Sequence, residues 1–553
     1  MEQVQKKKKT SFMKNVLMLM IAQFVVKLLG FIYKMVIVNI EGFGDIGNGY
    51  YNTGYQIYSL LLTISSVGLP SVIAKLVSER VAIGDHKGAN RIFKVALKIF
   101  TTVGMILSLG LFFGADAIAR YIINVPDVKY TLMVLAPAIV MVSSSSILRG
   151  YFAGLGNMKP TSVSQVLEQF FNCLLTICFV YAMIGKDTAI MAAAGNLSTT
   201  CAIVISISYL IIFYKRSKKE INIECNNQTV PMENKTVRQL VKTILAISIP
   251  MTIGSLISVV NAAIDTVTVS NCVQKVYQSI MQVGKAELEA EAMRVVGIIS
   301  KVDTIIHLPL ALNIAFSTAL VPEISAAIAK NDMERAKKRL SFSFFATILI
   351  VAPCVVGLMV LATPILQLIY PTASEGGMIL AISSLIILFV AVNYVINGGL
   401  YGIGKIYIPA IALLVGGIVK FILNIVLISN PNIYILGSPI SSVVCQFVAV
   451  TICYVALKKH IKLEHDIKNH VIKPVFSACV MGVIVWLAYK LLLGYFGNSI
   501  STIVSVIIGA VIYVIMLILT KTLTKEDFYM IPYGTKIYKV LVKLGIYKEE
   551  VNN

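Results

Sequence analysis

The chain has 553 residues, of which 57% are hydrophobic and only 14% are charged. A soluble protein of this length needs more charge to cover its surface, so the composition excludes an ordinary soluble globular fold. The net charge of +21 would suggest a nucleic-acid partner in a soluble protein. Here the Lys and Arg residues lie in short segments between long apolar stretches, so we expect no nucleic-acid partner.

The first apolar stretch follows a basic N-terminus and resembles a signal peptide at its start. It continues past Lys27 and lacks a small-x-small cleavage site, so we interpret it as a retained helix. Each later stretch is long enough to cross a hydrocarbon core of about 30 Å as a helix. The predicted fold is an all-α membrane protein with 14 transmembrane helices, at 14–39, 54–78, 93–115, 130–153, 160–184, 190–214, 240–270, 297–328, 341–367, 378–402, 406–429, 434–457, 473–494 and 500–522.

The Lys and Arg residues alternate between the two sides of the membrane in this scheme. Segments expected to be cytoplasmic hold 36 of them, segments expected to be external hold seven, and five lie inside helices. Because Lys and Arg favour the cytoplasmic side, the bias indicates an even number of spans with both ends inside. We therefore predict a multi-pass protein of the cell (plasma) membrane with cytoplasmic N- and C-termini.

Metal and cofactor chemistry finds little support in the sequence. The nine cysteines form no CxxC pair, and most lie in apolar segments, so neither a disulfide framework nor a zinc site is expected. The stretch GYFAGLGNMKP lacks the Lys-Ser/Thr ending of a phosphate-binding loop. We expect no metal, no cofactor and no catalytic residue, so transport energy would come from a gradient, the membrane potential or downhill substrate flow.

The two halves of the chain resemble each other in blocks expected on the cytoplasmic side. Residues 68–91 match residues 319–339, and GYFAGLGNMKP at 150–160 matches GGLYGIGKIYIP at 398–409. Nearly equal offsets indicate two parallel six-helix lobes, a plan common in transporters, whereas shared helix-end chemistry is the alternative. The predicted domains are an N-terminal lobe at 1–214, a cytoplasmic linker at 215–239, a C-terminal lobe at 240–458, helices 13 and 14 at 459–523 and a cytoplasmic tail at 524–553.

Several charged residues fall inside the predicted helices, where each costs about 2.5–3.5 kcal/mol at the bilayer centre and usually faces a cavity or a partner. We predict that they line a water-filled cavity between the lobes and bind an anionic headgroup. Snorkelling toward the interface is the alternative, above all for Lys75 near a helix end. The predicted substrate-binding residues are Lys27, Lys34, Lys75, Asp265, Lys301 and Asp303.

Two further polar sets have more than one reading. Lys420 and Asn424 lie on one helical face, and Asp265 is a candidate partner for Lys420. The pair of Lys420 and Asp265 would be structural, or the ammonium group of Lys420 would occupy the place of a bound coupling cation. Glu168 is explained as well by a structural pairing with Arg149 as by a contact with substrate.

The segment SSSILRGYFAGLGNMKPTSVSQVLEQ resembles the characteristic segment of the stage V sporulation protein B group of polysaccharide transporters. KLLGFIYK at 27–34 resembles the first-helix stretch of MurJ-type lipid II flippases, with Lys in both Arg positions, and residues 302–325 resemble their helix 8. The resemblance covers nearly the whole chain and implies the multidrug/oligosaccharidyl-lipid/polysaccharide exporter superfamily. It implies alternating access, cavity charges that hold a pyrophosphate and sugar headgroup, and a lipid-tail groove formed by helices 13 and 14.

The predicted function is that of a flippase for an undecaprenyl-pyrophosphate-linked peptidoglycan precursor, lipid II. Its partners would be this glycan substrate, membrane lipids and cell-wall synthesis enzymes, and it would act as a monomer. Alternatives are export of another lipid-linked glycan, of a capsule or spore envelope, and drug–cation antiport, which the basic Lys27 and Lys34 disfavour. A membrane glycosyltransferase is disfavoured because the largest external loop, 271–296, carries its acids on one short segment.

Overall fold

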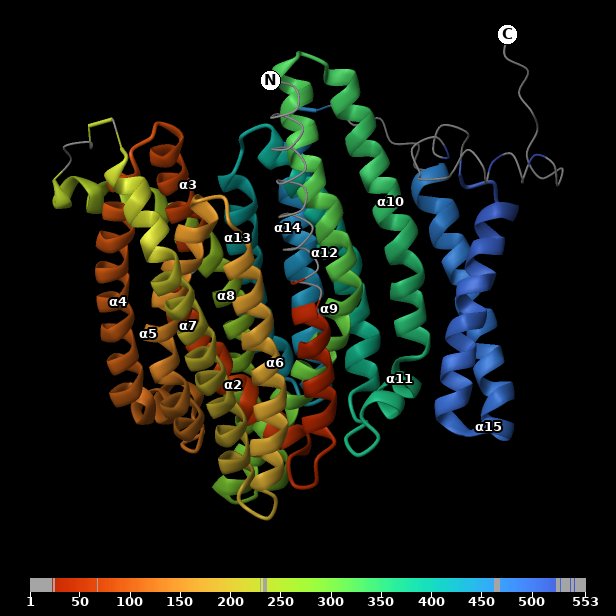
Figure 1. Ribbon diagram of the computed structural model, residues 1–553. Helices are drawn as coiled ribbons and strands as arrows, with labels where there is room; N and C mark the ends of the chain where they lie inside the picture. The colour runs from red at the N-terminus through yellow and green to blue at the C-terminus, as the bar shows by residue number, and fades with distance from the viewer. Residues whose placement is uncertain are drawn as a thin grey trace, which may run out of the picture. The chain divides into compact units, whose positions relative to one another are not determined.

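The computed structural model describes residues 22, 25–66, 68–228, 230–231, 236–461, 468–523, 528, 538 and 542, apart from the side chains of 312, 314–319 and 322. Within these ranges every regular element is a helix, which confirms the all-α prediction (Figure 1). After a helical stretch at residues 25–38, the first helices are α2 (Gly44–Ser66), α3 (Leu69–Ala82), α4 (His86–Ala117), the π-helical η1 (Ile118–Ile123), α5 (Val128–Gly154), α6 (Lys159–Ala182), α7 (Thr188–Asn226) and α8 (Val237–Met281). The later helices are α9 (Lys285–Ala329), α10 (Met333–Val360), α11 (Ala362–Ile369), α12 (Gly377–Gly402), α13 (Tyr407–Ile428), η2 (Tyr434–Leu436), α14 (Gly437–Lys458), η3 (Lys468–Ile472) and α15 (Lys473–Leu519).

Eleven helical segments of the described ranges are long and apolar enough to cross a membrane. One of them contains α15, which is interrupted at Gly497, where φ is 68° and ψ is 177°. These dihedrals lie outside the helical region, so α15 consists of two helices, as the separate predictions at 473–494 and 500–522 require. The total of 14 spans stays a prediction, because the first helix lies partly outside the described residues.

The second predicted helix, 54–78, is wrong in its boundaries. Helix α2 begins ten residues earlier, at Gly44, and a new helix, α3, begins at Leu69. Gly68, with φ of 83°, breaks the run, and Pro70 fits the first turn of α3, where no backbone N–H is needed. The early start of α2 places Asp45 in a helix instead of in a loop.

The polar segment predicted as a linker at 215–239 is helical for half of its length. Helix α7 continues to Asn226, and α8 begins at Val237 behind a capping box formed by Thr236 and Gln239. With 39 and 45 residues, both helices are about twice as long as a membrane crossing requires. Their ends therefore extend beyond the hydrocarbon layer.

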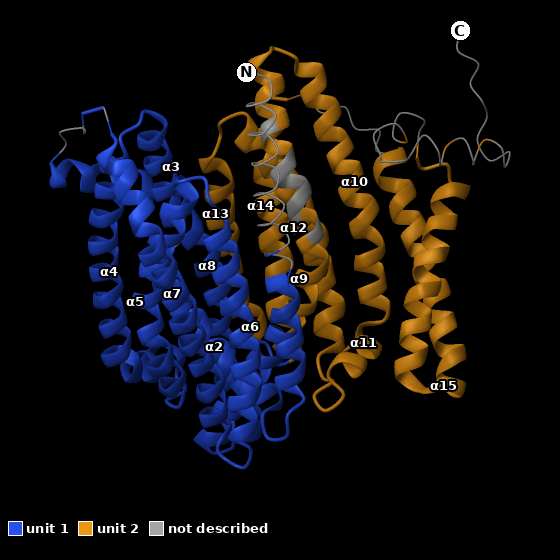
Figure 2. Ribbon diagram, viewed as in Figure 1, with its two compact units in different colours: residues 1–301, 429–431 blue, residues 302–428, 432–553 orange. Residues whose placement is uncertain are grey.

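The chain forms two compact units, which Figure 2 distinguishes by colour. Unit 1 comprises Met1–Lys301 and Ser429–Pro431, and unit 2 comprises Val302–Ile428 and Asn432–Asn553. The core of unit 1 is built from α3, α4, α5, α7 and α8, and a core of unit 2 from α9, α10, α12, α13 and α14. The boundary falls inside α9, so the division into two six-helix lobes with a linker stays a prediction.

Candidate functional site

A buried ion pair joins α9 to the first turn of α2 in unit 1. The Nζ atom of Lys301 lies 2.7 Å from Oδ1 and 2.8 Å from Oδ2 of Asp45. The Lys301 side chain is wholly inaccessible to solvent, and the Asp45 side chain is 8% exposed. A buried lysine requires such compensation, because an isolated buried ammonium is strongly disfavoured.

A second lysine lies next to this pair. Lys34, on the helical stretch 25–38, donates to the hydroxyl of Ser300 at 2.7 Å and reaches the Ser300 carbonyl oxygen at 3.4 Å. Since Ser300 directly precedes Lys301 on α9, two of the predicted site lysines contact neighbouring residues of the same cluster. As a residue Lys34 is half-buried.

The backbones of α2 and α9 approach closely at this point. A Cβ atom on Gly49 would lie 1.9 Å from the carbonyl oxygen of Met293, and one on Gly297 would lie 1.8 Å from that of Asp45. The side chain of Asn48 donates to the Gly297 carbonyl oxygen at 2.7 Å. Glycine is required on both helices, because only a residue without a side chain permits such contact. Together these interactions fasten the beginning of α2 to residues 293–301 of α9.

The remaining predicted substrate-binding residues lie apart from this cluster or are not placed against it. Lys27 is exposed, and Lys75 is exposed on α3, with Glu79 4.0 Å away. Asp303 is exposed on α9 and Asp265 is half-buried on α8. Whether these four share a cavity with Lys34 stays a prediction.

Lys420 and Asn424 are both buried and lie four residues apart on α13 of unit 2. Asp265 belongs to unit 1, so its proposed pairing with Lys420 also stays a prediction. Within the described residues no group of three or more His, Cys, Asp and Glu side chains is arranged to hold a metal ion.

Glu168 forms the ion pair with Arg149 that was one of its two predicted roles. A guanidinium nitrogen of Arg149 lies 2.5 Å from Oε2 of Glu168. The same guanidinium group donates to the hydroxyls of Ser164 and Ser206, both at 2.9 Å. The arginine thus links α5, α6 and α7 inside unit 1.

Sequence reasoning missed Asp45, Asn48 and Ser300. Asp45 and Asn48 lie in GFGDIGNG, whose glycines suggested an external loop. One signal could have indicated Asp45: it is an acidic residue between two apolar helices, and the lysines inside the predicted helices need a negative partner. Ser300 carried no signal of its own, because serines are common in membrane helices.

The comparison with protein families identifies the chain. A family model described as "Polysaccharide biosynthesis protein" matches residues 12–328, more than half of the sequence. The chain belongs to this family. A second model, MatE, matches residues 267–426. The chain therefore belongs to the multidrug/oligosaccharidyl-lipid/polysaccharide exporter superfamily, as the sequence resemblance implied.

Relatives of this family member cover almost its full length. It is 27% identical to stage V sporulation protein B of Bacillus subtilis (strain 168), over 95% of this chain and 98% of the relative. It is 23% identical to the lipid II flippase MurJ of the same organism, over 91% and 93% of the two chains. The helices and these relatives together identify a multi-pass membrane protein.

Solved structures show the same fold. A structure titled "Lipid II flippase MurJ, inward closed conformation" matches with a TM-score of 0.67 and 16% identity, covering 90% of this chain and 97% of that chain. An inward-facing multidrug resistance MATE family transporter matches with a TM-score of 0.64 and 13% identity, covering 79% and 94%. At these identities the likeness concerns the fold alone.

Proposed function

We propose that this protein is a flippase that moves a lipid-linked cell-wall precursor from the inner to the outer leaflet by alternating access. The proposed cargo is the undecaprenyl-pyrophosphate-linked peptidoglycan unit, lipid II. The observation that carries the proposal is the half-buried Lys34 at the junction of the helical stretch 25–38 with α9. A half-buried cation suits a pyrophosphate, whose charges must be compensated while it crosses the bilayer.

The tight contact between α2 and α9 supports the alternating-access part of the proposal. By the predicted topology, the beginning of α2 is its external end. The Asp45–Lys301 pair and the Asn48–Gly297 hydrogen bond would then close the external side of the cargo path. Release of cargo to the outer leaflet would require these interactions to separate, and their re-formation would return the protein to its inward-open state.

The same geometry would serve a different lipid-linked glycan. The identity to stage V sporulation protein B, 27%, exceeds the 23% to MurJ, which favours a spore-envelope or other polysaccharide repeat unit as the second candidate. A drug–cation antiporter would need an acidic binding region, whereas Lys34 is basic. In either glycan reading the protein transports and makes no covalent bond, so it is not an enzyme.

Replacement of a depleted lipid II flippase by this protein tests the proposal. We expect wild type to restore growth and to clear accumulated lipid-linked precursor, and Lys34→Ala to lose most of this activity at equal expression. Lys34→Arg should retain activity, and Lys186→Ala serves as the matched control, because Lys186 is exposed between α6 and α7 and has no predicted role in the cargo path. Wild type that fails to clear lipid II would reject this cargo in favour of another glycan. Full activity of Lys34→Ala would remove Lys34 from the cargo path.

A further inference from the structure

One face of α4 carries four cations in a row. Lys87, Arg91, Lys94 and Lys98 follow one another at intervals of four, three and four residues, which aligns them along one side of the helix. Lys87, Lys94 and Lys98 are exposed and Arg91 is half-buried. The stripe is about 16 Å long at the rise of an α-helix.

The same face continues as an exposed apolar surface. The same spacing of three and four residues continues beyond Lys98 and places Thr102, Met105, Leu109 and Phe112 on this face. The exposed fractions of Met105, Leu109 and Phe112 are 45%, 48% and 41%. The opposite face of α4 packs into the core of unit 1 through residues such as Phe93, whose ring stacks on Tyr151 at 4.4 Å. A single uncovered face therefore changes from cationic to apolar along its length, as a phospholipid changes from headgroup to acyl chain.

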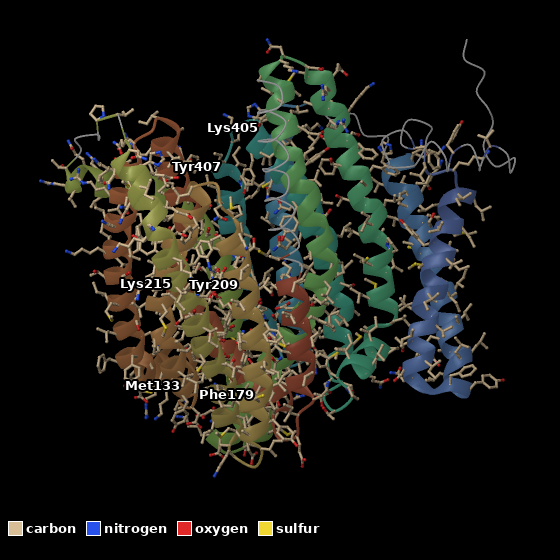
Figure 3. The ribbon with its side chains drawn as sticks, in the orientation of Figure 1. Met133, Phe179, Tyr209, Lys215, Lys405 and Tyr407 are labelled. Carbon is tan, nitrogen blue, oxygen red and sulfur yellow. The ribbon has the colours of Figure 1, made fainter. Side chains whose placement is uncertain are left out.

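The extension of α7 adds four more cations beside the beginning of α4. Ile221 and Cys225, one turn apart, are buried against the core residues of α4. The side chain of Gln228 accepts from the backbone N–H of Lys87 at 2.7 Å and donates to Asp85 at 3.1 Å. The extension is thus held in place, and its exposed cations are Lys215, which Figure 3 labels, Arg216, Lys218 and Lys219.

The acidic groups nearby do not neutralise these cations. Asp85 is buried and accepts from the backbone of Gly88, and Glu224 lies 3.4 Å from His86. Within the described part of the chain, none of the eight cations has a carboxylate oxygen within 4.0 Å. Exposed Ile83 and Ile223 lie next to these contacts. Cations mixed with exposed apolar side chains are typical of a surface that binds lipid.

We propose that the exposed face of α4 and the α7 extension form a binding surface for anionic phospholipids. The cations of α4 and α7 hold the headgroup phosphates, and Met105, Leu109 and Phe112 contact the acyl chains. The lipids belong to the leaflet at this end of α4, which the distribution of Lys and Arg predicts to be the cytoplasmic one. This surface is separate from the Asp45–Lys301 cluster and does not depend on which glycan is transported.

Native mass spectrometry of the purified full-length protein, exchanged with equal amounts of phosphatidylglycerol and phosphatidylcholine, tests the surface. We expect wild type to retain phosphatidylglycerol in preference. The variant Lys87→Gln/Arg91→Gln/Lys94→Gln/Lys98→Gln should lose this retention at least tenfold, because each cation near an anionic surface contributes a several-fold gain in affinity. Lys87→Arg/Lys94→Arg/Lys98→Arg should retain the lipid, and size-exclusion profiles confirm that each variant is folded.

A matched control removes the same number of exposed cations elsewhere. Lys330, Lys338, Lys458 and Lys459 are all exposed and lie in unit 2. Their combined change to Gln should leave phosphatidylglycerol retention at the wild-type level. Equal retention of the two lipids by wild type, unchanged retention by the α4 variant, or an equal loss in the control would each overturn the proposal.

Discussion

A wholly buried lysine needs a compensating charge, and Lys301 has one in Asp45. Removal of one member of such a pair is expected to cost about 3–5 kcal/mol, because the other charge stays buried. Removal of both members costs less, since no charge remains to be compensated. The pair therefore fixes how α2 meets α9 more than it adds net stability.

We expect Lys301→Ala to lower the thermal unfolding temperature of the purified protein markedly. Asp45→Ala/Lys301→Ala should recover part of that loss, which a double-mutant cycle measures. Lys75→Ala is the control, because the Lys75–Glu79 pair is 4.0 Å long and both side chains are more than half exposed. If Lys301→Ala and Lys75→Ala shift unfolding equally, the buried pair has no special role.

The helix pair α2–α9 depends on glycine in a way that can be tested. A methyl group on Gly49 or Gly297 would overlap a backbone carbonyl oxygen of the partner helix, so Gly49→Ala and Gly297→Ala should both force the helices apart. We expect lower thermal stability and loss of complementation in the depletion strain.

Gly110 and Gly254 provide the matched controls for this experiment. A Cβ atom at either helical position meets no atom within 4 Å, so their change to Ala should be neutral or stabilising by up to about 1 kcal/mol. Destabilisation of the same size at all four positions would mean that close helix contact is not what Gly49 and Gly297 provide.

The helices were largely predictable, but the start of α2 was not. Apolar length alone located most helices, because the cost of an unsatisfied backbone in lipid leaves few alternatives. GFGDIGNG looked like a loop because glycine disfavours isolated helices. It is helical here because glycine allows α9 to approach, a long-range contact that no local pattern reveals. Lys34 and Lys301 stand out in the sequence as charges inside apolar stretches, whereas Asp45 and Ser300 meet them only through this long-range contact. That the two lysines bind substrate stays a prediction.

At the scale of the whole molecule, the distribution of charge makes a prediction about orientation. In a variant without its nine native cysteines, a single cysteine at Lys186 should react with a membrane-impermeant maleimide in intact cells. Single cysteines at Lys219 and Lys458 should react only after permeabilisation, because both positions lie in basic segments predicted to be cytoplasmic. Labelling of all three in intact cells, or the reverse pattern, would contradict the predicted topology.

The Asp45–Lys301 pair also bears on how the protein is made. Its two members are 256 residues apart in the chain. At a synthesis rate of about 5–20 residues per second, the ribosome needs roughly 10–50 s to reach Lys301 after Asp45 has emerged. During that interval the Asp45 carboxylate on α2 cannot yet pair with Lys301. The packing of the beginning of α2 against α9 is therefore completed only after more than half of the chain has been synthesised.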